Sequence, residues 1–328
     1  MAVAKSTGRK PYTATRTVRV HARRISVAIA NGVINRELVY RIVGRINRQT
    51  GSITSVFLVY PARDDYALAY VYPQRIERIR WNPWPVGVIR QNGKFAIMFG
   101  VSSNDSHFAK SSHVEDLAAL TERMEKLRVL LGAKQKTFAG VLPGLLAQRG
   151  ILTDTPEADV TATVVVQAIA TLKLEAGLPP TAPVIVLGGG GFVGRRIVSL
   201  LGTKQRVEVV DQIHGYPAEL PADLSGRPVV LLNVAAPGAI GEYLDSLWPE
   251  MVVLNEVYPE PSPTEVAALT ALGVPCFHVA GVKARAFPPF PAAYAGAVPC
   301  CAAWPSDDLE PVLRRMSPGP TSNRGEVL

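Results

Sequence analysis

The chain is poor in cysteine and histidine and has no long apolar run. Its 328 residues include three Cys and five His. Three Cys cannot build a disulfide framework, and no Cys and His are spaced as zinc ligands, so we expect a cytoplasmic protein without a bound metal. No apolar run reaches the ~18–20 residues that a membrane-spanning helix needs, so no membrane span is expected.

Charged residues are also scarce. They make up 19% of the chain, whereas apolar residues make up 48%. Such a composition allows a large buried core and excludes a wholly disordered chain. At roughly 100–200 residues per domain, the length predicts two domains.

Acidic residues are nearly absent from the first 48 residues. That segment has eleven Lys or Arg and one acid, Glu37, so it carries +10, while the whole chain carries +8. The basic character therefore belongs to the N-terminus, and the body of the protein is close to neutral. We expect residues 1–24 to form a basic, flexible arm. No apolar stretch directly follows these charges, so a signal peptide is not expected, whereas a transit peptide stays an alternative.

Residues 25–178 mix strand and helix patterns and predict an α+β substrate domain. Short runs of β-branched and aromatic residues predict strands at 55–60, 67–72, 86–90, 94–101 and 137–142. Asn92-Gly93 separates two of these strands and is typical of a tight hairpin turn. Apolar residues three and four apart predict helices at 114–131 and 159–177, with a short helical turn at 143–150.

From residue 179 onward, strands and helices alternate. Apolar runs predict strands at 184–187, 207–210, 228–233, 251–255 and 275–279, with helices at 194–201, 240–247 and 264–273. Continuously apolar strands are typical of a parallel sheet that is covered on both faces. We therefore predict an α/β protein in which residues 179–304 form a Rossmann-like, doubly wound parallel sheet. Residues 305–328 are expected to be a C-terminal tail with a short helix at 309–316.

The strongest motif follows the first strand of this second domain. Gly189, Gly191 and Gly194 fit the pattern G-x-G-x-x-G between a strand and a helix. The first Gly makes a tight turn, the second lets the backbone approach a pyrophosphate, and the third allows close contact between helix and strand. The helix N-terminus offers free N–H groups to the phosphates. The predicted nucleotide-binding residues of the turn are Gly188, Gly189, Gly190, Gly191, Phe192, Val193 and Gly194.

An acid stands at the end of the next predicted strand. Asp211 lies 22 residues after Gly189, where dinucleotide-binding folds place the carboxylate that accepts from the adenine ribose. A carboxylate at this position also repels a 2′-phosphate. The sequence therefore predicts NAD or NADP as the cofactor, and Asp211 favours NAD.

Polar residues end two further strands. Asn233 and Val234 close one strand, and Asn255, Glu256 and Tyr258 follow the next. The carboxyl ends of parallel strands face the cofactor in an open α/β sheet, so we expect these residues near the nicotinamide. Asn233 and Val234 are predicted to bind the cofactor, and Tyr258 is a candidate catalytic residue. Capping of an ordinary loop is the alternative for Asn255 and Tyr258.

Two vicinal cysteines lie near the end of the second domain. Cys300 and Cys301 follow Pro299. A thiolate is an effective nucleophile toward a thioester or aldehyde carbonyl, so both are candidate catalytic residues. The alternatives are a pair of small buried apolar side chains or a redox pair.

Several segments, in this order, resemble the long-chain acyl-[acyl-carrier-protein] reductase family and its relatives. The resemblance covers roughly residues 55–304. Its residues are Phe57–Pro61, Val86–Ile89, Phe99-Gly100, Leu131–Ala133, Phe138–Gly140, Gly188–Gly194, Val253–Pro259, Gly281-Val282 and Pro299–Ala303.

The resemblance implies an NAD(P)-dependent oxidoreductase that reduces an acyl thioester to an aldehyde. In that family a Cys near the C-terminus carries the acyl group, and the matching position is Cys300, with Cys301 as the second register. The implied substrate is a small molecule or is carrier-bound, and an acidic acyl-carrier protein would suit the basic arm. Two features depart from the family: it mainly uses NADPH, whereas Asp211 favours NAD, and Trp304-Pro305 stands where a helix would continue.

Two other functions stay open. The layout from Asn233 to Tyr258 is also similar to shikimate dehydrogenases, which oxidise a ring hydroxyl without a covalent intermediate. Their catalytic Lys has no clear match here, since Lys134 and Lys136 lack the surrounding pattern. The third function is a non-catalytic protein that binds nucleotides or nucleic acid. Apart from Tyr12 and Tyr40, however, the basic segment lacks interleaved aromatic residues, and nucleic acid is not the expected partner. A homo-oligomer is compatible with each function.

Overall fold

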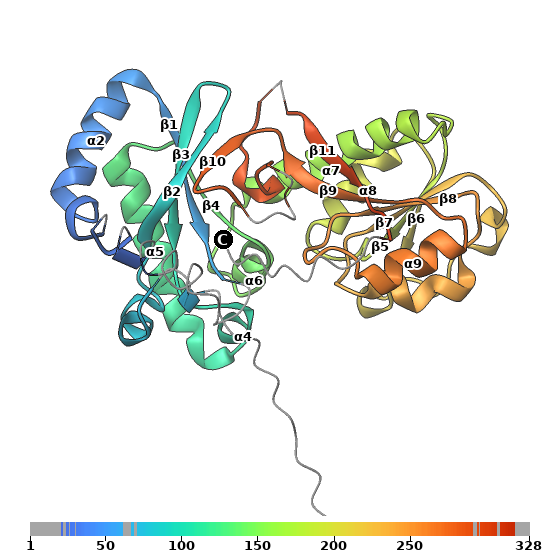
Figure 1. The fold of residues 1–328 in the computed structure, drawn as a ribbon, viewed down its shortest axis with the longest axis horizontal. Helices are drawn as coiled ribbons and strands as arrows, with labels where there is room; N and C mark the ends of the chain where they lie inside the picture. The colour runs from blue at the N-terminus through green and yellow to red at the C-terminus, as the bar shows by residue number, and fades with distance from the viewer. Residues whose placement is uncertain are drawn as a thin grey trace, which may run out of the picture.

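The computed structural model shows a mixed α/β protein with two sheets, each in its own lobe (Figure 1). It describes residues 21, 24–25, 27–29, 31–61, 67–68, 71–290, 294, 296–306 and 309–318. Nearly all of the expected basic arm lies outside this part of the chain, so its role stays a prediction. No helix in the described part is long and apolar enough to cross a membrane.

The sheet of the first lobe has five strands in the order β10-β2-β3-β1-β4. At its centre, β1 (Ile53–Val59) runs parallel to β3 (Lys94–Gly100) and to β4 (Gln135–Phe138). β2 (Trp84–Gln91) is antiparallel to β3, and β10 (Arg285–Phe287) is antiparallel to β2. The carboxyl ends of β1, β3 and β4 therefore lie at one edge.

The Asn-Gly turn between β2 and β3 is confirmed. Asn92 has φ 48° and Gly93 has φ 75°, as a tight hairpin turn with positive φ at both central residues requires. The strand expected at 67–72 is wrong, because Ala67 and Leu68 are helical. That segment instead leads into two single turns of 3₁₀ helix, η1 (Pro73–Arg75) and η2 (Glu77–Ile79).

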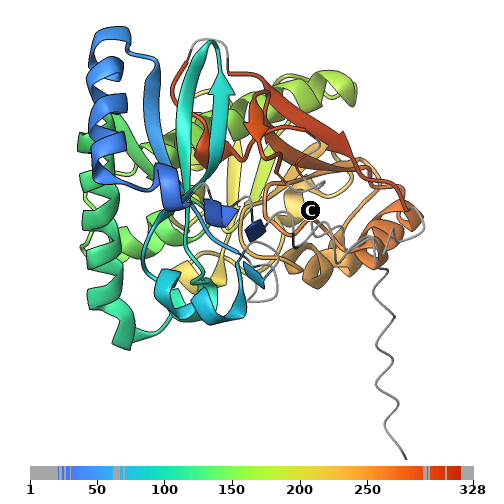
Figure 2. The same cartoon turned by 60° about the vertical axis from the view of Figure 1, so that its left-hand side comes forward.

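Helices cover one face of this sheet. The predicted helix at 114–131 is confirmed as α5, which follows α4 (Asp105–Phe108) and η3 (Ser111–His113) and ends at Gly132. Its buried side chains are Leu117, Leu120, Thr121, Met124 and Leu131. α2 (Glu37–Thr50) packs on α5 at the outer edge of the lobe (Figures 1 and 2). The helical turn expected at 143–150 is α6 (Leu142–Gln148).

The sheet of the second lobe has six strands in the order β11-β9-β8-β7-β5-β6. Five of them are parallel: β5 (Val184–Leu187), β6 (Val207–Val210), β7 (Val229–Asn233), β8 (Met251–Asn255) and β9 (Cys276–Val282). These are the five strands that the apolar runs predicted. The chain passes from β5 to β6 on one side and then crosses to β7 on the other, so the winding reverses between β5 and β7. In open α/β sheets, ligands bind at such a reversal, outside the carboxyl ends of the strands.

This second sheet is covered on both faces, as its continuously apolar strands predicted. α7 (Pro156–Glu175) and α8 (Gly194–Gly202) pack on one face, against the cluster that includes Val184 and Val186. The other face, which includes Ile185 and Leu187, packs on side chains from the remaining helices. These helices are η5 (Ala222–Leu224), η6 (Ala239–Ser246) and α9 (Pro263–Ala271). η4 (Gln212–His214) follows β6.

Two strands join a sheet outside the segment to which the predicted domain boundaries assigned them. β10 lies within 179–304 but joins the sheet of the first lobe, next to β2. β11 (Pro311–Arg315) lies within the expected tail and pairs antiparallel with β9, so the helix expected at 309–316 is wrong. An open edge on β9 would leave a row of unpaired N–H and C=O groups, and β11 covers that row.

One hydrophobic cluster joins the two lobes. It combines Phe57 and Met98 of the first sheet with Val164 of α7 and Leu232 of the second sheet. η8 (Cys300–Ala302) packs against both α7 and β4 within this region. The two lobes therefore share a core around α7, and the segment that carries the vicinal cysteines lies between them.

Candidate functional site

The predicted glycine turn connects β5 to α8 at the reversal of the sheet. Gly188 has φ 81°, a conformation that favours glycine. A Cβ on Gly194 would lie 2.1 Å from the carbonyl oxygen of Gly188, and one on Gly189 would lie 2.8 Å from Cγ1 of Val209. Three of the glycines are thus required by the backbone and by the contact between helix and strand.

The turn presents backbone donors at its outer side. The N–H of Gly191 donates to the carbonyl of Gly188 at 3.0 Å. The N–H groups of Phe192, Val193 and Gly194 have no hydrogen-bond acceptor within the described residues. They open α8, where the helix dipole adds a partial positive charge. This arrangement suits an anion such as a pyrophosphate.

The carboxylate of Asp211 lies against the same turn, as its place at the end of β6 predicted. Its Oδ2 accepts from the N–H of Gly190 at 3.0 Å and from Nδ1 of His214 at 2.8 Å. Within the described part of the chain, its Oδ1 accepts only the N–H of His214, at 3.3 Å. Asp211 therefore fixes the turn, and Oδ1 keeps capacity for a further donor such as a ribose hydroxyl. A ribose at this place would lie beside His214 and Tyr216, which both border Gly190.

Three polar side chains form a row across β7, β8 and β9, with Asn233 and Asn255 at the carboxyl ends of β7 and β8 and His278 within β9. Asn233 pairs in register with Asn255, and Asn255 with His278. Nδ2 of Asn233 donates to Oδ1 of Asn255 at 2.8 Å, and Nδ2 of Asn255 lies 3.0 Å from Nδ1 of His278. All three are buried. The pKa of His278 is lowered, chiefly because burial disfavours its charged form.

This row also shapes the loop beside the glycine turn. Oδ1 of Asn233 accepts from the N–H of Ala235 at 3.1 Å, and the N–H of Val234 donates to the carbonyl of Leu187 at 3.0 Å. Asn233 and Val234 thus lie next to the turn. Their hydrogen bonds hold the loop in place, and any contact with a cofactor stays a prediction.

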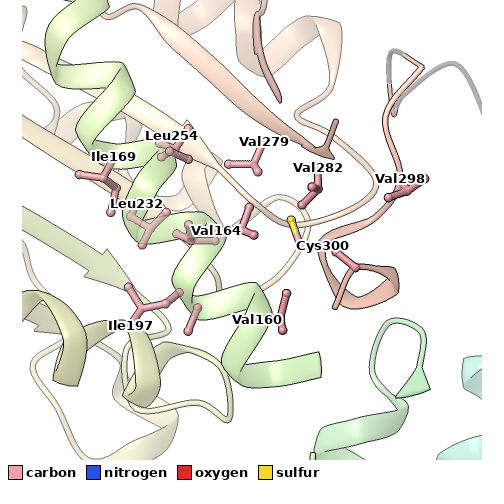
Figure 3. Close-up of a cluster of buried hydrophobic side chains, with 14 of the residues drawn as sticks. Val160, Val164, Ile169, Ile197, Leu232, Leu254, Val279, Val282, Val298 and Cys300 are labelled. Atoms are coloured by element: carbon pink, nitrogen blue, oxygen red, sulfur yellow. The ribbon is translucent and has the colours of Figure 1, made fainter. Parts of the chain in front are cut away.

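The vicinal cysteines both lie at the hydrophobic cluster that joins the lobes. Cys300 is 7% exposed, and its sulfur points into the shared hydrophobic cluster between Val164 and Val282 (Figure 3). Cys301 is only partly buried, and the N–H of Gly140 donates to its sulfur. The environment of Cys300 fits the alternative of a small buried apolar side chain, whereas Cys301 is the more accessible of the two.

Neither thiol is poised as a thiolate. Burial raises the pKa of Cys301 to about 12, and burial followed by the nearby carboxyl of Glu256 raises that of Cys300 well above its ordinary value. Among the described residues, the largest contributions to either shift include none from a Lys, Arg or His. Reactive cysteines usually lie in electropositive surroundings that lower the pKa. Any nucleophilic role here would therefore need a base to take the thiol proton.

Two carboxyl groups lie near these thiols, and both have a raised pKa. Glu256 follows β8 directly, and its pKa is raised to about 7 by burial. Glu157, in the first turn of α7, is 1% exposed, and burial raises its pKa to about 7. Both act electrostatically on Cys301. A carboxyl group with a pKa near 7 can give or take a proton at neutral pH, which is the property that acid–base catalysis needs.

Tyrosines complete the region between the lobes. Tyr258 is 41% exposed, and its ring stacks on that of Tyr294 at 5.5 Å. Burial raises the pKa of Tyr294, and the nearby thiols and Glu256 raise it further. The hydroxyl of Tyr60, at the end of β1, accepts from the N–H of Val141 at 3.1 Å. The predicted Tyr258 thus lies close to the cysteine segment, and Tyr60 joins them from the first lobe.

Glu157 was missed in the sequence because nothing in its local pattern marks it. An acid in the first turn of a helix is ordinarily a surface group that favours the helix dipole. Here the N–H of Phe138 donates to its Oε1 at 3.2 Å, and Oε2 is buried without a hydrogen-bond partner in the described structure. Only the packing of β4 against α7 reveals its burial.

We expect Glu157→Gln to be more stable than the wild type at pH 8 but not at pH 4. Below pH 4.5 the carboxyl is protonated in both folded and unfolded chains. Between pH 4.5 and about 7 only the unfolded chain loses its proton, so the stability that Glu157 contributes falls as the pH rises. Above pH 7 the full loss is about 3 kcal/mol, at ~1.4 kcal/mol per pKa unit.

Urea unfolding of both proteins from pH 4 to pH 8 measures this difference. Glu256 titrates in both proteins and cancels in the comparison. Glu122→Gln, at an exposed position of α5, serves as the control and should follow the wild type at every pH. If the free energies of unfolding of Glu157→Gln and wild type differed by the same amount at every pH, the raised pKa of Glu157 would be contradicted.

Comparison with known proteins assigns no family: no protein-family model matches the chain, and no curated protein matches it. Among the described residues, no group of three or more His, Cys, Asp or Glu is arranged to hold a metal ion. The function is therefore argued from the geometry of the glycine turn and of the region between the lobes.

Proposed function

We propose that the protein is an NAD(P)-dependent oxidoreductase with a Rossmann-like nucleotide-binding lobe. The observation that carries this proposal is the glycine turn. It lies at the reversal of the parallel sheet, and three N–H groups at the start of α8 have no acceptor among the residues that the structure describes. Four consecutive glycines lose much backbone entropy on folding, and close approach by a ligand is one reason to keep them. The identity of the aldehyde or alcohol that is formed or consumed stays open.

Each predicted cofactor residue has a role in this proposal. The N–H groups of Phe192, Val193 and Gly194 would hold the pyrophosphate, and Oδ1 of Asp211 would accept from the adenine ribose. The carboxylate of Asp211 would repel a 2′-phosphate, so NAD is preferred. When bound, the nicotinamide supplies or accepts the hydride.

Glu256 is placed to handle the proton of the same reaction. Reduction of a carbonyl group adds one hydride to carbon and one proton to oxygen. Glu256 stands at the carboxyl end of β8, the edge where the sheet would present the nicotinamide, and its raised pKa leaves it partly protonated at neutral pH. It would donate the proton in reduction and accept it in oxidation.

Titration of the full-length protein with NADH and with NADPH tests the proposal. We expect NADH to bind at least about tenfold more tightly than NADPH, because only the 2′-phosphate meets the Asp211 carboxylate. Isothermal calorimetry and the fluorescence of the nicotinamide would both report the affinities. Binding of neither dinucleotide would overturn the proposed function, and tighter binding of NADPH would overturn the role of Asp211.

Reduction of an acyl thioester through a covalent intermediate is the second candidate. The position of Cys301 favours it, because this residue is only partly buried between the lobes and its sulfur accepts an N–H from Gly140. The thiolate would attack the carbonyl carbon and expel the carrier thiol, while Glu157 or Glu256 takes the proton from Cys301. An acyl adduct in the intact mass of the wild type, absent from Cys301→Ala and present in Cys300→Ala, would establish this route.

A further inference from the structure

Two arginines stand in the first turn of α8, directly after the glycine turn. Arg195 is exposed, whereas Arg196 is partly buried. Arginine is a common ligand of phosphate groups, because its planar guanidinium donates several parallel N–H bonds. A basic side chain at this place would therefore ordinarily be assigned to the pyrophosphate itself. The contacts of Arg196 assign it a different role.

Each of the three guanidinium nitrogens of Arg196 has a partner within the protein. Nε donates to Oδ1 of Asp159 at 2.7 Å, and Nη2 donates to Oγ1 of Thr155 at 3.1 Å. Nη1 donates to the carbonyl oxygen of Phe192 at 2.8 Å. The guanidinium thus joins the start of α7 to the glycine turn. The Asp159 carboxylate also balances its charge, so Arg196 attracts a phosphate less than an unpaired arginine would.

The bond to Phe192 fixes a peptide group that the helix itself leaves free. In a regular α-helix the carbonyl of Phe192 would accept the N–H of Arg196, but that N–H donates to the carbonyl of Val193 at 3.1 Å. Among the described residues, the side chain of Arg196 is the only donor to the carbonyl of Phe192. This carbonyl and the N–H of Val193 belong to one planar trans peptide group and point in opposite directions. Holding the carbonyl therefore aims the N–H of Val193.

The side chain of Phe192 is held as well. Cζ of Arg196 lies 4.3 Å from the centre of the Phe192 ring, within the range of a cation–π contact. A Cβ on Gly144 would lie 3.3 Å from Cβ, Cγ and Cδ1 of Phe192, so α6 of the first lobe also packs closely on this side chain. The backbone of the turn is thus fixed before any ligand binds. Preorganised donors bind an anion more tightly than mobile ones, because no ordering remains to be done on binding.

We propose that Arg196 is a positioning residue of the nucleotide site, which aims the N–H of Val193 at the pyrophosphate and does not bind the phosphate itself. The inference rests on the proposed function, because it takes a dinucleotide as the ligand of the glycine turn. It also places part of the site outside residues 179–304, since Thr155 precedes α7 and Asp159 lies in its first turn. The buried Glu157 belongs to the same turn of α7, which therefore contacts both the glycine turn and the region between the lobes.

Titration of full-length variants with NADH tests the role of Arg196. Arg196→Met should bind NADH at least about tenfold more weakly than the wild type, the effect of losing one hydrogen bond to a charged group. Arg196→Lys keeps the charge but not the planar set of three donors, so it should be weakened at least about fivefold. Arg195→Met is the matched control, because it removes the same charge from the same helical turn at an exposed position. It should stay within about threefold of the wild type at physiological salt.

Asp159→Ala gives a test of opposite sign. Removing a negative charge near an anion site should tighten the binding of NADH if charge alone matters. If Asp159 acts by holding Arg196, the substitution should instead weaken the binding at least about threefold. In the Arg196→Met background Asp159→Ala should no longer weaken it, because no guanidinium is left to hold. A loss of stability alone would not reverse in this way. Asp154→Ala, at an exposed position just before α7, is the control and should not weaken binding in either background.

The outcomes separate this inference from the proposed function. Wild-type affinity in Arg196→Met, or equal losses in Arg195→Met and Arg196→Met, would overturn the positioning role. So would unchanged or tighter binding of NADH by the single variant Asp159→Ala. A wild-type protein that binds neither NADH nor NADPH would overturn the proposed function instead. Thermal unfolding of each variant shows that it is folded at the temperature of the titration.

Discussion

Gly194→Ala should abolish dinucleotide binding and lower the stability of the second lobe. The new methyl carbon would lie 2.1 Å from the carbonyl oxygen of Gly188 and 2.8 Å from the Cα of Gly189. Both are backbone atoms of the turn, so α8 must move away from β5. Overpacking of this kind costs about 1–3 kcal/mol or more. A shift of α8 also moves the N–H groups of Phe192 and Val193, so we expect the affinity for NADH to fall at least about 100-fold.

Gly202→Ala, in the same helix, is the matched control. No atom lies within 4 Å of its added Cβ, so this substitution should leave the turn unchanged. Replacing a helical Gly by Ala stabilises by up to about 1 kcal/mol, so its melting temperature should equal or exceed that of the wild type. Thermal unfolding and NADH titration of both variants give the comparison. Wild-type affinity in a folded Gly194→Ala protein would show that the turn does not hold the nucleotide.

The second lobe could be predicted from the sequence because its signals are local. β5, β6 and β8 begin and end at the predicted residues, since each is a short, mainly apolar run bounded by charged residues or by Pro and Gly. The neighbouring places of Asn233 and Asn255 also follow from a general rule, because the carboxyl ends of parallel strands share one edge. His278 lies inside β9, and only the register of β9 on β8 brings it beside Asn255. The order of the strands in the sheet was not predicted, but the rule holds for parallel strands in any order.

The region between the lobes could not be predicted, because it depends on contacts between segments far apart in the chain. The sequence favoured Cys300 through a resemblance, yet its sulfur faces the apolar cluster and Cys301 is the partly exposed neighbour. Glu157 is 19 residues from Phe138, whose N–H it accepts, and no pattern links the two positions.

The edges of the two sheets and α2 show a similar limit. β10 pairs with β2 across nearly 200 residues, and β11 owes its extended form to the open edge of β9. Neither segment has a strong strand pattern of its own. In α2 the spacing of Leu38 and Ile42 would ordinarily predict a buried face, but the close contact at Gly44 turns that face outward. In each case tertiary contacts override the local pattern.

Glu256→Gln should lower kcat for reduction of a carbonyl substrate about 10²–10⁴-fold, the usual range for losing a general acid. Glutamine has nearly the same shape but cannot release the proton to the developing alkoxide. In the wild type the reduction rate should fall as the pH rises through about 7, because the carboxyl group then loses its proton. The oxidation rate should rise over the same range, since the carboxylate is then the base. Both pH dependences should be absent from the variant.

Glu250→Gln is the control that separates the loss of a proton donor from the loss of one negative charge near β8. Glu250 immediately precedes β8 and Glu256 immediately follows it, so the two acids mark opposite ends of one strand. If chemistry is confined to the carboxyl end, Glu250→Gln should keep the kcat and the pH profile of the wild type. Affinity for NADH should be similar in both variants, because neither residue contacts the glycine turn in our proposal. Equal loss of kcat in the two variants would assign the effect to long-range charge and remove Glu256 from the proton transfer.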